Sequence, residues 1–303
     1  MNAVLGPLLT GLVSYPFSET LRNQTIGLEA VTLLLVVPLT AVSAALTWRG
    51  RQAGPVLALG PATYAAYMML QYLVGPGYTY YPRVLPLHLG LFVLSAAVAL
   101  GAWSAVAATA LPTTSRPVDR RHATLLLVLA AFVVSRYLSV PAGSWQESAI
   151  PPDLTRESGM FWTILTLDLG VVVPLTIWAS VLLRRGVPAG RKATYAVLGW
   201  FALVPPSVTA MAVVMVVNGD PHGSVLQVLV FSVATVGFWV FAYGASRPLR
   251  THAAGTGPRR RPLLSVRVPP PGGRLLGAPD HRCRRVPVRP GTRPPRSGCG
   301  PGR

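Results

Sequence analysis

Five ionisable or amide side chains lie inside long apolar stretches: Glu29, Gln71, His88, Arg136 and Asp168. Such groups are expensive inside a bilayer and are therefore candidates for function. Tyr64 and Tyr67 precede Gln71 with i, i+3 and i+7 spacing, which places the three on one face of a helix. A pocket of phenol, amide, imidazole and paired charge suits a small polar ligand, or a carboxylate that carries protons.

The same residues also have structural interpretations. Arg136 and Asp168 lie at similar depths in adjacent stretches, so they can form an ion pair that holds two helices together. Glu29 and Gln71 can lie at the level of the lipid headgroups. A lone histidine such as His88 is more often a hydrogen-bonding residue than a ligand. The sequence leaves a ligand site and a structural cluster both open.

Seven apolar stretches position these side chains, each long enough to cross a bilayer, which takes about 20 residues. They lie near 26–48, 54–74, 84–110, 122–141, 161–183, 193–217 and 223–245. Only 12% of the residues are charged, against about 25% in soluble domains. The predicted fold class is all-α: a polytopic membrane helix bundle of about seven transmembrane helices, with the lipid bilayer as its main partner.

The basic residues near the ends of the stretches predict the orientation, because they mark the cytoplasmic side. Alternate connections hold eleven basic residues and one acid, Asp119. The basic residues are Arg49, Arg51, Arg116, Arg120, Arg121, Arg184, Arg185, Arg191, Lys192, Arg247 and Arg250. The N-terminus is therefore expected outside, the C-terminus inside, and the protein in the inner (plasma) membrane as a multi-pass protein.

Three parts are expected along the chain: an extracytoplasmic segment 1–25, a membrane domain 26–250 and a cytoplasmic tail 251–303. The tail holds twelve Arg and one Asp and is rich in Pro and Gly. Such a composition cannot bury a core and predicts disorder. The tail is either a polybasic segment on anionic lipid or the product of a frameshift in GC-rich DNA, and we favour the frameshift.

An internal repeat is suggested by two identical runs. Val36-Val37-Pro38-Leu39-Thr40 recurs as Val172-Val173-Pro174-Leu175-Thr176, and Ala62-Thr63-Tyr64-Ala65 recurs as Ala193-Thr194-Tyr195-Ala196 with a spacing that differs by five residues. Two parallel three-helix units joined by an inverting helix would give this pattern, as in some transporters such as the SWEET carriers. Chance identity in an alphabet rich in Val, Leu, Ala and Thr is the alternative.

Several activities are excluded by residues that the chain lacks. Its only lysine, Lys192, is at the mouth of a stretch, where it cannot form a retinal Schiff base. His88 is the one histidine expected within the bilayer, since His122 is at the very start of its stretch, so a bis-histidine haem site cannot form. There is no HExxH motif for zinc and no glycine-rich phosphate loop. No cofactor, metal, catalytic residue or nucleic-acid partner is predicted, and the oligomeric state is left open.

The chain resembles a group of uncharacterised bacterial multi-pass integral membrane proteins with seven helices. The resemblance covers roughly residues 20–245 and rests on three features. These are an acid entering the first helix before a proline (Glu29 and Pro38), a tyrosine-rich second helix (Tyr64, Tyr67 and Tyr72), and Asp168-Leu169-Gly170 before Pro174. The acid in the first helix is usually Asp in that family and is Glu29 here. No activity of the family is assigned, so the resemblance implies only the topology and the interest of Glu29 and Asp168.

Three functions remain open. A small-molecule transporter or permease-like protein is the leading hypothesis, with an outward-facing polar site of Glu29, Tyr64, Tyr67, Gln71, His88, Arg136 and Asp168. A ligand-sensing or accessory membrane subunit is the second, and a lipid-modifying membrane enzyme is the third. The sequence contains no motif that decides between them.

Overall fold

The computed structural model describes residues 2–13, 15, 17–75, 82–138 and 158–255. Within them the chain forms helices and turns and no strand, so the predicted all-helical membrane bundle is confirmed. Residues 256–303 lie outside the described part, and so do the predictions for the tail.

The first half of the bundle contains the following elements: α1 (Asn2–Leu5), α2 (Glu19–Val31), η1 (Thr32–Val36), α3 (Val37–Trp48), α4 (Ala53–Val74), η2 (Pro82–Val84), α5 (Leu85–Ala105), η3 (Ala108–Ala110) and α6 (Arg116–Ser135). The second half contains α8 (Ser158–Leu167), η5 (Asp168–Val172), α9 (Val173–Arg184), α10 (Pro188–Phe201), α11 (Val204–Val217) and α12 (Val225–Gly255). Elements η1 and η5 are π-helical turns inside longer helices.

Five helices in the described residues are long and apolar enough to cross a membrane: Glu19–Trp48, Leu85–Ala105, Ser158–Arg184, Pro188–Val217 and Val225–Arg247. Helices α4 and α6 run beside them and are 22 and 20 residues long. The first spanning helix begins at Glu19, earlier than the predicted stretch at 26, because the Ser18 side chain caps it by accepting a hydrogen bond from the Leu21 N–H. The count of seven spans and their orientation stay predictions.

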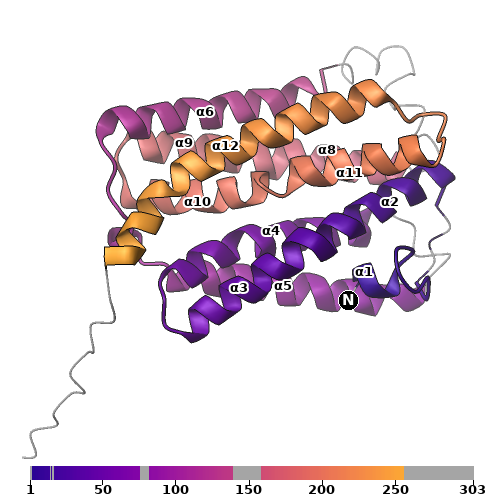
Figure 1. The fold of residues 1–303 in the computed structure, drawn as a ribbon, viewed down its shortest axis with the longest axis horizontal. Coiled ribbons are helices and arrows are strands. Elements are labelled where there is room, and N and C mark those ends of the chain that lie inside the picture. Colours follow the sequence, from indigo (N-terminus) through magenta and orange to yellow (C-terminus); the bar gives the residue numbers. More distant parts are fainter. Residues whose placement is uncertain (1, 14, 16, 76–81, 139–157, 256–303) are drawn as a thin grey trace, which may run out of the picture. The chain divides into compact units, whose positions relative to one another are not determined.

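The long helices lie side by side, and their ends gather into two groups (Figure 1). Helices α3, α5, α9 and α12 end where α4, α6 and α10 begin, at the left of the view. We call this the arginine end, because the basic residues counted above that the structure describes all lie near these helix termini. The other end, where α2, α8 and α12 begin, is the opposite end.

Local structure repeats between the two halves of the bundle. A π-helical turn precedes Val37-Pro38 and again Val173-Pro174, and its first residue is Thr32 in one half and Asp168 in the other, 136 positions later (168 minus 32). The same interval separates Gly50 from Gly186 (186 minus 50), which both end their helix with positive φ, at 67° and 71°. The Val-Val-Pro-Leu-Thr runs therefore have equivalent places in two repeat units, unit A (19–105) and unit B (158–255).

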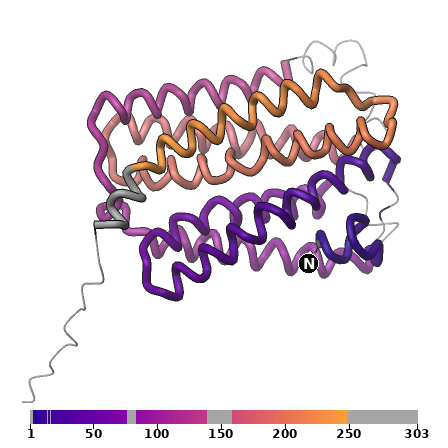
Figure 2. Tube along the Cα trace, in the orientation of Figure 1, coloured from indigo at the N-terminus to yellow at the C-terminus, as the bar shows by residue number. Residues whose placement is uncertain are grey.

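The two Ala-Thr-Tyr-Ala runs are not equivalent in this register. The 136-residue interval pairs Tyr64 with Trp200, whereas Tyr195 lies about two helix turns from the start of α10 at the arginine end. The tracing of the chain (Figure 2) places α4 and α10 in different halves of the bundle. Their shared letters reflect the limited alphabet of membrane helices.

Prolines divide the spanning helix Pro188–Val217 into α10 and α11. Pro205 and Pro206 have no N–H to donate to the preceding turn, so carbonyl groups are left without their helical partners. The Trp239 indole N–H on α12 donates to the Ala202 carbonyl at 2.8 Å, which is the carbonyl that Pro206 leaves free. Lipid offers no donor for this carbonyl, so the indole stabilises the break.

Glycines bring the two units together. A Cβ on Gly199 of α10 would lie 2.7 Å from the Gly60 Cα of α4, and one on Gly27 of α2 would lie 2.5 Å from the Met211 backbone N of α11. A Cβ on Gly159 of α8 would lie 2.6 Å from the Gly75 carbonyl oxygen after α4. Small residues allow such close backbone contact, which is how helices associate in lipid.

Substituting Gly199→Ala tests the close approach of α4 and α10. The new methyl group forces the two backbones apart, so we expect the free energy of unfolding to fall by about 1–3 kcal/mol. Thermal unfolding of the full chain in detergent measures this. Gly90→Ala on α5 is the matched control, because nothing lies within 4 Å of its Cβ position. Equal melting temperatures for the two variants would contradict the glycine contact.

Substituting Trp239→Phe tests the break between α10 and α11. The ring is kept while the N–H is removed, which leaves the Ala202 carbonyl without its donor. We expect a loss of about 1–2 kcal/mol in unfolding free energy. Trp178→Phe on α9 is the control, because its side chain is similarly exposed, at 46% against 45% for Trp239. The hypothesis fails if both substitutions lower the melting temperature equally.

Candidate functional site

A group of polar side chains meets at the level of the two π-helical turns, between the repeat units. We call it the central polar cluster and define it by Thr32, Tyr64, Tyr67, Tyr137, Asp168 and Ser207. It contains three of the predicted site residues, Tyr64, Tyr67 and Asp168. The other four, Glu29, Gln71, His88 and Arg136, lie around it.

Asp168 is the one carboxylate of this cluster and is 4% exposed. The Tyr67 hydroxyl of α4 donates to its Oδ1 at 2.5 Å, and the Tyr137 hydroxyl after α6 donates to its Oδ2 at 2.6 Å. Both carboxylate oxygens thus have a phenol donor. Because Tyr67 belongs to unit A and Asp168 to unit B, the first of these bonds crosses between the units.

Aromatic rings pack against Tyr67, one of the two phenols that bind this carboxylate. The Tyr67 ring packs edge-on against Trp200 of α10, with 5.1 Å between centroids. Trp200 in turn packs against Phe201 at 4.8 Å. Gln71, one turn beyond Tyr67 on the same face of α4, contacts the Tyr67 hydroxyl with its side chain. Asp168 is therefore a buried acid among phenol and indole rings.

The second half of the cluster is neutral. The Tyr64 hydroxyl lies 2.7 Å from Ser207 Oγ on α11 and also contacts the Thr32 side chain. Tyr64 is 1% exposed and Ser207 is fully buried. Tyr64 and Tyr67, one turn apart on α4, therefore reach the first residues of the two π-helical turns, Thr32 and Asp168.

Arg136 does not pair with Asp168, and the ion pair that the sequence allowed is not formed. Arg136 is exposed, and its guanidinium carbon lies 5.8 Å from the centroid of the Tyr137 ring. The last turn of α6 tightens, with the Arg136 and Tyr137 N–H groups bonding three residues back. This turn directs Tyr137 inward and Arg136 outward, so the neighbouring tyrosine reaches the acid.

Glu29 and His88 lie in a separate group nearer the opposite end, beneath the N-terminal segment. The Leu8 backbone N–H donates to Glu29 Oε2 at 3.1 Å. The Tyr15 hydroxyl lies 2.9 Å from His88 Nε2, and its ring stacks on Tyr72 at 5.6 Å. Glu29 is 2% exposed and His88 is fully buried. The structure therefore divides the predicted single site into two.

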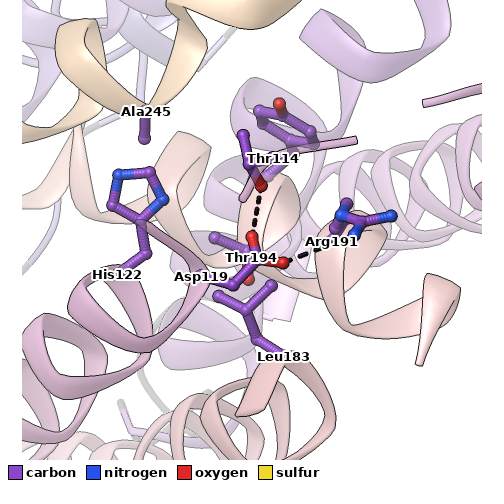
Figure 3. A pocket seen from close by; sticks show the side chains of 8 residues that line it. Thr114, Asp119, His122, Leu183, Arg191, Thr194 and Ala245 are labelled. Atoms are coloured by element: carbon purple, nitrogen blue, oxygen red, sulfur yellow. Dashed lines mark hydrogen bonds and ion pairs between the residues drawn. The ribbon is translucent and has the colours of Figure 1, made fainter. Parts of the chain in front are cut away.

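A pocket lies at the arginine end, and the sequence did not predict it. Its empty volume, including the open mouth, is about 290 Å³. Asp119 at the start of α6 accepts hydrogen bonds from the Thr114 hydroxyl and from Arg191 of α10, with 3.3 Å to the guanidinium (Figure 3). His122 faces the same pocket from α6. These contacts join α6 to α10 at this end.

Sequence reasoning missed several of these residues. Tyr137 stands beside the charged Arg136 and Ser207 follows two prolines, so neither is distinguishable as a site residue in the sequence. Asp119 was noted only as the one acid among the basic residues. A useful indication was present in the shared Val-Pro pairs, since each one marks a π-helical turn that begins with a polar residue.

Comparison with known proteins adds no relative: no family model, curated protein or solved structure matches the chain.

Asp220 joins the turn between α11 and α12 to α2 at the opposite end. It accepts hydrogen bonds from the Thr20 hydroxyl at 3.1 Å, the Asn23 amide at 3.0 Å and the His222 N–H at 2.9 Å. Burial raises the pKa of the Asp220 carboxyl, but these donors outweigh it and hold the pKa below its ordinary value of 3.8.

The lowered pKa of Asp220 predicts a pH dependence. A depressed folded-state pKa contributes stability above the unfolded value near 3.8, and this contribution is lost as pH falls through the folded value. We expect Asp220→Asn to lower the melting temperature at pH 7 and to differ less from wild type below about pH 4. Glu19→Gln, which removes an exposed acid near the same end, is the control. A difference between wild type and Asp220→Asn that is constant with pH would contradict the assignment.

Proposed function

We propose that this integral membrane protein is a small-molecule transporter whose substrate passes through the central polar cluster. The observation that carries the proposal is the hydrogen bond from Tyr67 of unit A to Asp168 of unit B. In transporters built from structural repeats, the binding site lies near the bilayer midplane at the interface between repeats. The cluster lies between the two units, at the π-helical turns inside Glu19–Trp48 and Ser158–Arg184, and this supports the proposal.

The contacts between the units support this function. At Gly27, Gly60 and Gly199 the contact between the units is made by backbone atoms, because glycine has no side chain to insert between the helices. Such an interface can change its crossing angle without unpacking large side chains. The proposed cycle is a rocking of the two units about the glycine contact.

The orientation and location belong to the same proposal. The arginine end faces the cytoplasm of a bacterial cell, because basic residues remain on that side. The opposite end, with Glu29 and His88 nearby, faces outward. We also propose membership in the group of uncharacterised bacterial multi-pass proteins that the sequence resembles, on the strength of Glu29, the tyrosines of α4 and Asp168.

A sensor or accessory subunit is the second candidate, and the N-terminal segment favours it. Leu8 and Tyr15 cover Glu29 and His88 from the chain's own first residues. A site covered in this way can respond to a ligand by releasing the segment, with no passage across the membrane.

Thiol labelling of a Ser207→Cys variant separates the two functions without a known substrate. The natural thiols Cys283 and Cys299 are first replaced by Ser. An impermeant maleimide is then added to right-side-out and to inverted vesicles. We expect labelling from both sides, since alternating access opens the cluster to each side in turn.

Two control variants define the sides. Ser104→Cys lies at the arginine end and Ser224→Cys precedes α12 at the opposite end, so each is expected to label from one side only. Labelling of Ser207→Cys from one side alone would contradict transport and favour the sensor hypothesis. Absence of labelling from both sides, with the controls reacting, would make the cluster structural.

A further inference from the structure

The chemical class of the substrate can be inferred from the charges around Asp168. We infer that the central polar cluster binds a small organic cation, an ammonium compound, whose charge lies against the Asp168 carboxylate. This inference rests on the proposed function, because it names the substrate of the same site. Four observations carry it.

The first observation is an imbalance of buried charge. Asp168 is 4% exposed, and the side chains that donate hydrogen bonds to it within the described residues are two neutral phenols. Burying a carboxylate away from water is costly unless a positive charge accompanies it. Among the described residues, the ion pair that forms is Arg191–Asp119, at the arginine end. Within the described residues, the buried Asp168 carboxylate therefore has no ion-pair partner.

The second observation concerns the basic side chains of the described part. Arg22, Arg83 and Arg136, which lie away from the arginine end, are all exposed. Lys192 is buried, but it lies over the Trp103 ring at 4.3 Å, near the start of α10. None of these four reaches Asp168 in the described structure. The described side chains thus leave Asp168 without a cation, and a cationic ligand can supply the positive charge.

The third observation is the arrangement of the two phenols. Tyr67 and Tyr137 approach different oxygens of the carboxylate at 2.5 and 2.6 Å. Each O–H donates in the way that an ammonium N–H would donate. Both are terminal groups on rotatable side chains, so a ligand can take the place of one while the other remains. Without a ligand, both oxygens of the carboxylate thus accept a hydrogen bond from a phenol. When a cation enters, it can replace one of these two phenols.

The fourth observation separates an organic cation from a metal ion. The hydroxyls of Tyr67 and Tyr137 contact the acid, Trp200 packs against the Tyr67 ring, and aromatic faces attract ammonium groups. A hard metal ion instead requires several oxygen ligands. Within the described residues no group of three or more His, Cys, Asp or Glu side chains lies together. One carboxylate among aromatic rings fits an ammonium compound better.

The test compares charged and neutral probes of one shape. Thermal unfolding of the full chain in detergent is measured with choline, with ethanolamine, and with the uncharged alcohol in which carbon replaces the choline nitrogen. Sodium chloride and sodium acetate report on inorganic cations and on anions. We expect stabilisation by an ammonium probe and none by the uncharged alcohol at the same concentration.

Four variants locate the effect. Asp168→Asn should weaken the response to the ammonium probe at least about tenfold, since a charged hydrogen bond is lost. Asp168→Glu, which keeps the charge, should retain part of it. Arg136→Gln should leave cation binding equal or stronger, because a like charge is removed. Asp119→Asn, which changes a buried acid that already has Arg191, should leave the response unchanged.

The outcomes separate this inference from the proposed function. A response to acetate that Arg136→Gln abolishes would overturn the cation assignment and indicate an anion site. A response to sodium alone, lost in Asp168→Asn, would replace the organic cation by an inorganic one. No response to any probe, with Ser207→Cys still labelled from both sides, would overturn the substrate class and leave transport standing. A response to the ammonium probe, with Ser207→Cys labelled from one side only, would support the cation as the ligand and contradict transport.

Discussion

The contact between α4 and α10 at Gly60 and Gly199 is the constraint on which the rest of this bundle depends. Without a hydrophobic force between helices in lipid, close backbone packing supplies the attraction. A Cβ on Gly60 would lie 2.9 Å from Gly199 backbone atoms, so only glycine fits there. This approach places Tyr64 and Tyr67 of α4 within reach of the other unit, where Ser207 and Asp168 receive their hydroxyls.

The second constraint is the need to satisfy every backbone polar group inside the membrane. Pro38 and Pro174 each remove an N–H from their helix. In both places the preceding turn widens, and the Val37 and Val173 N–H groups bond five residues back, to Thr32 and Asp168. The prolines thus explain why a π-helical turn occurs at the same place in each unit. The polar residue that begins each turn comes to lie against the tyrosines of α4.

Much of the fold follows from the sequence, because apolar length, loop charge and proline position are local properties. Each of the seven stretches contains a helix, and the Val-Val-Pro-Leu-Thr runs correctly indicated equivalent places in two units. The site was harder to predict, since it depends on which face of each helix meets its neighbour. Arg136 and Tyr137 are adjacent in sequence, yet one tightened turn sends them in opposite directions. Glu29 and His88 were placed with Asp168, because depth alone cannot show that the N-terminal segment covers them.

The most informative feature of the cluster is the place where the repeat is not symmetric. Thr32 and Asp168 occupy equivalent positions, and Thr32 satisfies its hydroxyl within its own helix by donating to the Leu28 carbonyl. A purely structural contact could use the same neutral residue on both sides, since neutral groups cost less to bury than a carboxylate. Unit B instead has an acid at this position, and the chain supplies two phenols to accommodate it. Because a charge buried in lipid lowers stability unless it is compensated, its presence on one side only argues for a function that stability alone does not require.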